Sequence, residues 1–103
     1  MIDPTQWDMA GSLPEGLSPP LQALWWLRKG GFAVGPEWER AHAICQSHEG
    51  DPAHDLAHAV AHLVEGDLFN ADYWFRRAGH ARRSDRAEAE WDWVAAELAA
   101  QAS

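Results

Sequence analysis

The sequence predicts an all-α domain of about five helices in antiparallel hairpins, and three observations support this. Apolar residues recur at the three- and four-residue spacing of amphipathic helices in separate stretches. Glycine, proline, serine or aspartate stands at the positions expected for helix ends. No stretch alternates apolar and polar residues as a strand would. Because 103 residues support one hydrophobic core, we expect a single domain over residues 19–103.

The first 18 residues carry four helix-breaking residues and no usable apolar period: Pro4, Gly11, Pro14 and Gly16. Such a composition is typical of irregular chain. We therefore expect residues 1–18 to form an extended or disordered N-terminal arm.

The first two helices are expected over residues 19–29 and 36–47. Pro19 and Pro20 suit a first helical turn, with Ser18 as its cap. The first helix is apolar almost all round, which is typical of a helix covered on two sides. The second has an apolar stripe at helical spacing, formed by Trp38, Ala41, Ile44 and Cys45.

The third and fourth helices are expected over residues 52–65 and 68–78, separated by a tight turn at Gly66-Asp67. Asp51 and Asp67 are the expected N-caps. On a helical wheel the third helix places Leu56, Val60, Leu63 and Val64 on one side and His54, His58 and His62 on the opposite side.

The fifth helix is expected over residues 85–99. Ser84 is its expected cap, and Asp85 and Glu88 are well placed for the positive end of the helix dipole.

A weak internal echo of roughly 30 residues indicates helical-hairpin repeats. The small residue Ala59 precedes the Gly66-Asp67 turn, and Ala71, Phe75 and Ala78 follow the turn. Small residues let two antiparallel helices approach closely. Residues 53–80 thus resemble a tetratricopeptide hairpin, which implies a compact tetratricopeptide-like helical domain.

A longer string, HAVAHLVEGDLFNADYWFRRAG, covers residues 58–79. It resembles a group of small uncharacterised proteins that share the pattern HxxxHxxEGDxxNAxYWxRRAG. This resemblance implies no established activity.

Composition narrows the partners and the cellular setting. The formal charge of -8, from 8 basic and 16 acidic residues, argues against nonspecific binding to nucleic acid or to anionic membranes. A single cysteine excludes an intrachain disulfide and favours a reducing, cytoplasmic setting. Neither a signal peptide nor an apolar run of about 18 residues is recognisable. We expect a cytoplasmic protein with no nucleic-acid or membrane partner.

The most metal-like feature is the stripe of His54, His58 and His62, spaced four residues apart. Neighbouring histidines on one helical face can share zinc or another imidazole-binding divalent metal. No HExxH motif or paired cysteine set accompanies them, so a further ligand would come from Asp55 or Glu65. The alternative is a solvated or hydrogen-bonded polar face. We expect no resident cofactor, with a metal at this stripe as the second possibility.

A second candidate site spans the hairpin and contains His58, His62, Asn70, Tyr73, Arg76 and Arg77. If these faces converge, they form a pocket for a carboxylate or phosphate, because arginine binds such anions through two hydrogen bonds. Alternatively, the arginines pair internally with Glu65, Asp67 or Asp72, and the histidines bond only to backbone or tyrosine.

Other reactive or bulky residues are assigned to packing. Cys45 lies on an apolar stripe, so we predict a core thiol rather than a Cys-His site with His42 and His48. Trp25, Trp38, Trp74 and Trp91 are expected in the core. Trp26 and Trp93 are candidates for an interface, where tryptophan is enriched.

These features favour a binding or assembly module that uses the His/Tyr/Arg face of the third and fourth helices. Its partner would be a protein or a small anionic ligand. One alternative is a metal- or small-molecule-dependent enzyme using His58 and His62, although no motif identifies a catalytic residue. The other is a homodimeric structural protein joined through exposed tryptophans.

Overall fold

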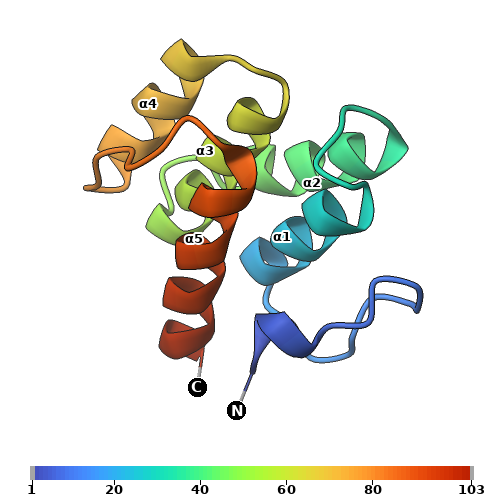
Figure 1. Cartoon of the computed structure of the whole chain (residues 1–103). Helices are drawn as coiled ribbons and strands as arrows, with labels where there is room; N and C mark the ends of the chain where they lie inside the picture. Colours follow the sequence, from blue (N-terminus) through green and yellow to red (C-terminus); the bar gives the residue numbers. More distant parts are fainter. Residues whose placement is uncertain (1, 103) are drawn as a thin grey trace.

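A computed structural model describes residues 2–102, so Met1 and Ser103 of the expected arm and domain lie outside it. Within this range the chain forms five α-helices, one short 3-10 helix and no strand (Figure 1). The elements are η1 (Pro4–Gln6), α1 (Pro19–Lys29), α2 (Pro36–Gln46), α3 (Pro52–Val64), α4 (Leu68–Arg77) and α5 (Ala87–Ala102). The predicted all-α class is confirmed. The first four helices begin where predicted, whereas α5 begins two residues later and extends further.

The helix α3 is the centre of the molecule. It packs against α1, α2, α4 and α5, and Figure 1 shows it between α4 on one side and α1 and α2 on the other. Nine of its thirteen residues are buried, including His54, Asp55 and His58. The polar side of this helix is therefore largely covered by its neighbours, with His54 and His58 buried and His62 half-buried.

Local hydrogen bonds explain where α3 and α4 begin. The side chain of Asp51 accepts a hydrogen bond from the backbone N–H of His54, and Asp67 does the same for Asn70. Both predicted N-caps are confirmed. Between the two helices Gly66 adopts a φ of 81°, a conformation that disfavours side chains other than glycine.

Of the two other predicted caps, Ser18 is confirmed in position and Ser84 is wrong. Ser18 holds the N-cap position of α1, but its side chain makes no capping bond in the described structure. The prolines at the first two helical positions lack N–H groups, which removes most of the available donors. Ser84 accepts from the Arg86 backbone N–H, but it stands before the first residue of α5, so it stabilises the preceding turn.

Four tryptophans lie in the core, as predicted: Trp25, Trp38, Trp74 and Trp91. Two of them also join helices through their indole N–H groups. Trp38 Nε1 donates to the Ala61 carbonyl at 2.7 Å and links α2 to α3. Trp91 Nε1 donates to the Leu24 carbonyl at 2.7 Å and links α5 to α1. Cys45 is fully buried, which confirms its assignment as a core thiol.

The segment before α1 is irregular apart from η1, and it lies against the helices. Arg28 Nη1 donates to the Pro4 carbonyl at 3.0 Å, and Lys29 Nζ donates to the Met9 carbonyl at 2.5 Å. The Trp7 ring also packs edge-on against Trp91, with 5.9 Å between centroids. These contacts attach residues 2–18 to α1 and α5.

The helix order allows a comparison with helical repeats. The pairs α1–α2 and α3–α4 pack as hairpins, but α5 packs back on α1 and α3, and α1 also contacts α3. In an open repeat array each unit contacts only its neighbours. The tetratricopeptide resemblance therefore stays a prediction. None of the described helices combines the length and apolar character needed to cross a bilayer.

Candidate functional site

Three imidazoles meet between α2 and α3. His42 comes from α2, whereas His58 and His62 come from successive turns of α3. One nitrogen from each ring lies within 4.8 Å of the other two. The closest pair is His42 Nε2 and His58 Nε2, at 3.2 Å. We call His42, His58 and His62 the histidine cluster.

Two tryptophans hold the cluster in place. Trp38 stands one turn before His42 on α2, stacks on its ring at 4.7 Å between centroids, and bonds to the backbone of α3. Trp74 reaches in from α4 and stacks on His58 at 4.0 Å. The imidazoles therefore lie between aromatic rings from both neighbouring helices, which limits their freedom to rotate.

Burial keeps two members of the cluster, His42 and His58, neutral. His58 is only 2% exposed, and this burial lowers its pKa to about 3, with further lowering by the charges of His62 and His42. The pKa of His42 is also lowered, first by burial and then by the charge of His62. At neutral pH these two rings are uncharged, and each carries a lone pair on one of its two nitrogens.

The cluster does not satisfy all of its own hydrogen-bonding groups. His58 shares a hydrogen bond with His42 through Nε2, but its buried Nδ1 has no partner within residues 2–102. Either tautomer of His58 leaves this nitrogen unpaired. A buried polar atom without a partner costs roughly 1–3 kcal/mol.

His62 has an anionic partner. Its Nδ1 donates to Glu65 Oε1 at 2.5 Å, and its side chain is 12% exposed. A carboxylate bonded to one ring nitrogen fixes the tautomer and leaves the other nitrogen with its lone pair. Asp67 also lies near His62 and Glu65, but it is engaged in capping α4 through Asn70.

Comparison of the chain with models of protein families, with curated proteins and with solved structures finds no significant match. The chemistry of the site must therefore be inferred from its residues and geometry.

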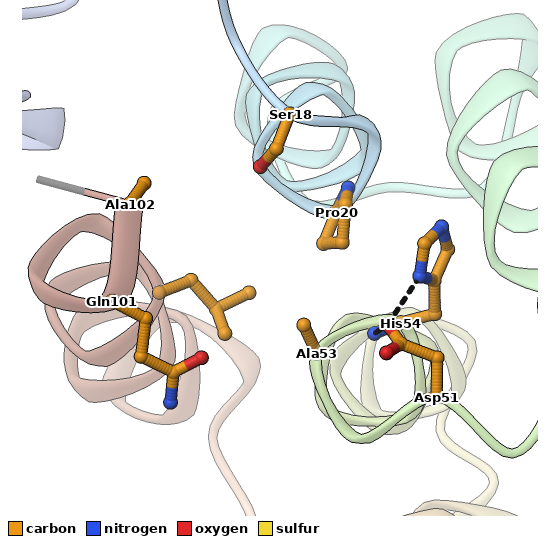
Figure 2. A pocket seen from close by; sticks show the side chains of 8 residues that line it. Ser18, Pro20, Asp51, Ala53, His54, Gln101 and Ala102 are labelled. Atoms are coloured by element: carbon orange, nitrogen blue, oxygen red, sulfur yellow. Dashed lines mark hydrogen bonds and ion pairs between the residues drawn. The ribbon is translucent and has the colours of Figure 1, made fainter.

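The predicted histidine stripe divides into two parts. His58 and His62 join His42, whereas His54 lies at the start of α3, where its Nδ1 bonds to Asp51 Oδ2 at 2.6 Å and its ring lies 4.8 Å from that of His48. Figure 2 shows His54 and Asp51 at the edge of a separate hollow of about 290 Å³. The hollow is lined by Ser18, Pro20, Asp51, Ala53, His54, Leu98, Gln101 and Ala102.

Tyr73 and Arg77 form a surface group beside the cluster. The Arg77 guanidinium donates to the Tyr73 hydroxyl at 3.1 Å, and this bond raises the pKa of Arg77. The guanidinium also lies 5.1 Å from the Trp74 ring centre, and its Nε is 4.0 Å from buried Asp55. Trp74 is the residue common to this group and to the cluster, since it also contacts His58.

The remaining two predicted ligand residues lie apart from the histidines. Asn70 is used at the turn, where its backbone and side-chain amides both donate to Asp67. Arg76 is exposed and lines a different surface hollow with Asp72 and Arg82. The predicted six-residue set therefore does not form one pocket.

Reasoning from sequence missed His42 as a member of the site. A signal was present, because Trp38 and His42 are four residues apart and share a helical face. What the pattern lacked was the pairing of that face with the histidine face of α3. This pairing is a property of tertiary packing.

Proposed function

We propose that this protein is a small, non-enzymatic helical binding module and that its ligand binds at the histidine cluster. The observation that carries the proposal is the convergence of three imidazoles from two helices within 4.8 Å. The sequence predicted a ligand on the wider His/Tyr/Arg face of α3 and α4. The ligand proposed here lies closer to α2.

The cost of the arrangement supports a ligand role. Buried polar side chains normally occur where each polar atom has a partner. Here His58 is buried beside the half-buried His42 and His62, and it retains an unpaired nitrogen. Sites that disfavour stability locally are typical of functional positions.

The properties of His58 favour binding over catalysis. A general acid or base works best when its pKa lies near the operating pH. The pKa of His58 is lowered to about 3, so the ring stays neutral through the physiological range. A permanently neutral imidazole is suited to donating a lone pair.

Several broader features belong to the same proposal. The close α3–α4 hairpin supports a tetratricopeptide-like description, while the contacts of α1 with α3 and α5 disfavour an open peptide groove. The net charge of -8 disfavours nucleic acid as a partner. A buried free thiol as the only cysteine supports a cytoplasmic setting.

A tryptophan-mediated homodimer has less support. Trp26 and Trp93 are only partly exposed, and each is covered by an arginine of its own chain. Arg40 lies 4.9 Å from the Trp26 ring centre, and Arg83 lies 4.2 Å from that of Trp93. Little indole surface is left for a second copy.

The test is a set of two-dimensional NMR spectra of the histidine side chains of the untagged protein. Zinc chloride, sodium phosphate and sodium acetate are added in separate titrations. We expect one of them to shift the resonances of His42, His58 and His62 together, while those of His48 and His80 stay in place. If none of the three shifts the cluster, the proposed function is wrong.

A further inference from the structure

We infer that the ligand of the histidine cluster is one divalent transition-metal ion of the zinc class, held by imidazole nitrogens of His42, His58 and His62. This inference rests on the proposed function, because it names the chemical class of the ligand for the same site. It differs from the metal stripe predicted from sequence, since His42 takes the place of His54.

The spacing of two of the nitrogens already fits a metal. Imidazole nitrogens lie about 2.0–2.1 Å from zinc, and tetrahedral angles then separate two such nitrogens by roughly 3.3–3.4 Å. His42 Nε2 and His58 Nε2 are 3.2 Å apart. An ion between them would take one lone pair from each nitrogen and would replace the hydrogen bond that the two rings share, and the proton of that bond would move to Nδ1 of its own ring.

The third imidazole is close enough to complete the set. Its nitrogen lies within 4.8 Å of those of His42 and His58, so an approach on the order of 1 Å brings it to coordination distance. Rotation about the side-chain torsions of His62, which lies one helical turn after His58, supplies such a movement. No change in the packing of α3 is needed.

The surroundings of the cluster match those of metal-bound histidines. Glu65 bonds to Nδ1 of His62, and a carboxylate in this position orients a ligating imidazole and raises its basicity. Trp38 and Trp74 fix the planes of His42 and His58 by stacking. The site therefore has an oriented ligand set on all three of its members.

The donor type determines which ions fit. Imidazole nitrogens suit zinc, copper, nickel and iron, whereas magnesium and calcium prefer oxygen ligands. A histidine binds such a transition-metal ion through the lone pair of its neutral imidazole. Three protein ligands leave a fourth position for water or for a small ligand from solution.

The decisive experiment measures zinc binding by isothermal titration calorimetry on the full, untagged chain at pH 7.5, with magnesium as the comparison ion. We expect one zinc per chain and no measurable magnesium binding. H42Q, at a half-buried position of α2, should weaken zinc binding by more than about 100-fold, and E65Q by about tenfold. The matched control is H48Q, because His48 is exposed in the turn that follows α2 and lies outside the cluster.

The outcomes separate the inference from the proposed function. Zinc binding that H42Q leaves unchanged, or that H48Q abolishes, overturns the inference. Absence of zinc binding combined with a phosphate-induced shift of the cluster histidines also overturns it, but leaves the proposed function standing. Absence of any response to zinc, phosphate and acetate contradicts both. Circular dichroism of each variant establishes that a loss of binding does not come from unfolding.

Discussion

At the N-terminal end of α3, His54 bonds to a carboxylate, whereas one turn later His58 faces only other imidazoles and a tryptophan. Both rings are buried and both have one nitrogen without a partner in the described structure. They belong to the same stripe and have the same spacing. The difference lies in what the neighbouring segments bring to each of them.

At the start of α3, Asp51 gives His54 a structural role. Its carboxylate accepts from the backbone N–H of His54 and bonds to the ring of the same residue, so one side chain both caps the helix and fixes the imidazole. One turn later, His58 has no carboxylate partner in the described structure, and His42 and His62 converge on it instead. A histidine stripe therefore indicates a candidate site only where another helix supplies a further imidazole, as α2 does with His42.

The largest expected effect of this difference is on stability in acid. Because the folded-state pKa of His58 is lowered from 6.5 to about 3, the unfolded chain binds an extra proton between these values, and stability falls as the pH falls from about 6.5 toward 3. The groups that face His58 are His42 from α2, His62 from α3 and the neutral Trp74 from α4. We expect a loss on the order of a few kcal/mol. Urea denaturation of the metal-free protein at a series of pH values measures it.

The pKa of Asp51, at the start of α3, is lowered like that of His58 but for the opposite reason, because the charged form of Asp51 is the one that is stabilised, and its pH window is different. The pKa of Asp51 is lowered, chiefly by its side-chain hydrogen bond with His54, so its contribution is present above about pH 3.8 and is lost below that value. Replacing His58 by Gln should remove most of the loss between pH 6.5 and 4. An unchanged pH profile in that variant would assign the acid sensitivity elsewhere.

The next largest effect on stability is expected from a bulkier residue at the α3–α4 contact. Ala71 is fully buried one turn before Trp74, so Ala71→Leu overpacks the hairpin and should cost roughly 1–3 kcal/mol. It should also displace Trp74 from His58 while leaving His54 in place. The denaturation midpoint and the NMR shifts of the two histidines measure these effects, with Ala43→Leu on the exposed side of α2 as the control. Wild-type stability would show that the helices are not in close contact there.

Removing the N-cap of α3 should have a smaller effect on stability, and it should act on His54 but not on the histidine cluster. Asp51→Ala removes the N-cap of α3 and the partner of His54, with an expected cost of about 1 kcal/mol. Asp67→Ala, at the equivalent position of α4, provides the comparison. Zinc affinity of Asp51→Ala should equal that of the wild type in the same calorimetric measurement. A strong loss of zinc affinity would mean that the Asp51–His54 pair and the histidine cluster do not act separately.

The smallest change in stability is expected from replacing two members of the histidine cluster by apolar residues. The double variant His42→Leu with His58→Leu replaces both partners of the shared hydrogen bond by side chains of similar size. Such paired replacement is nearly neutral or stabilising, so we expect a change of less than about 1 kcal/mol at pH 7. Urea denaturation tests it. Global unfolding of this variant would instead assign the histidines to a structural network.

The sequence predicted the helices well because their ends depend on local chemistry. Asp51 and Asp67 cap through backbone groups three residues away, and Gly66 supplies the positive φ that the turn requires. These interactions involve only neighbours in the chain. They are therefore visible as residue patterns.

The site was harder to predict, because it depends on which helix faces meet. A helical wheel shows that His58 and His62 share one side of α3, but it does not show that α2 and α4 cover that side. His42 joins them because α2 packs against α3, a contact to which Trp38 contributes through its bond to the Ala61 carbonyl. The placement of His54, Asn70 and Arg76 away from the cluster follows from the same long-range packing.

The most direct test of the account is X-ray absorption at the zinc edge of the protein loaded with one equivalent of zinc. If the histidine cluster is the site, the spectrum should show nitrogen ligands at about 2.0–2.1 Å and the multiple-scattering pattern of three imidazoles. In H42Q this pattern should weaken, whereas in H48Q it should stay the same. A first shell of oxygen ligands without an imidazole pattern would contradict the account.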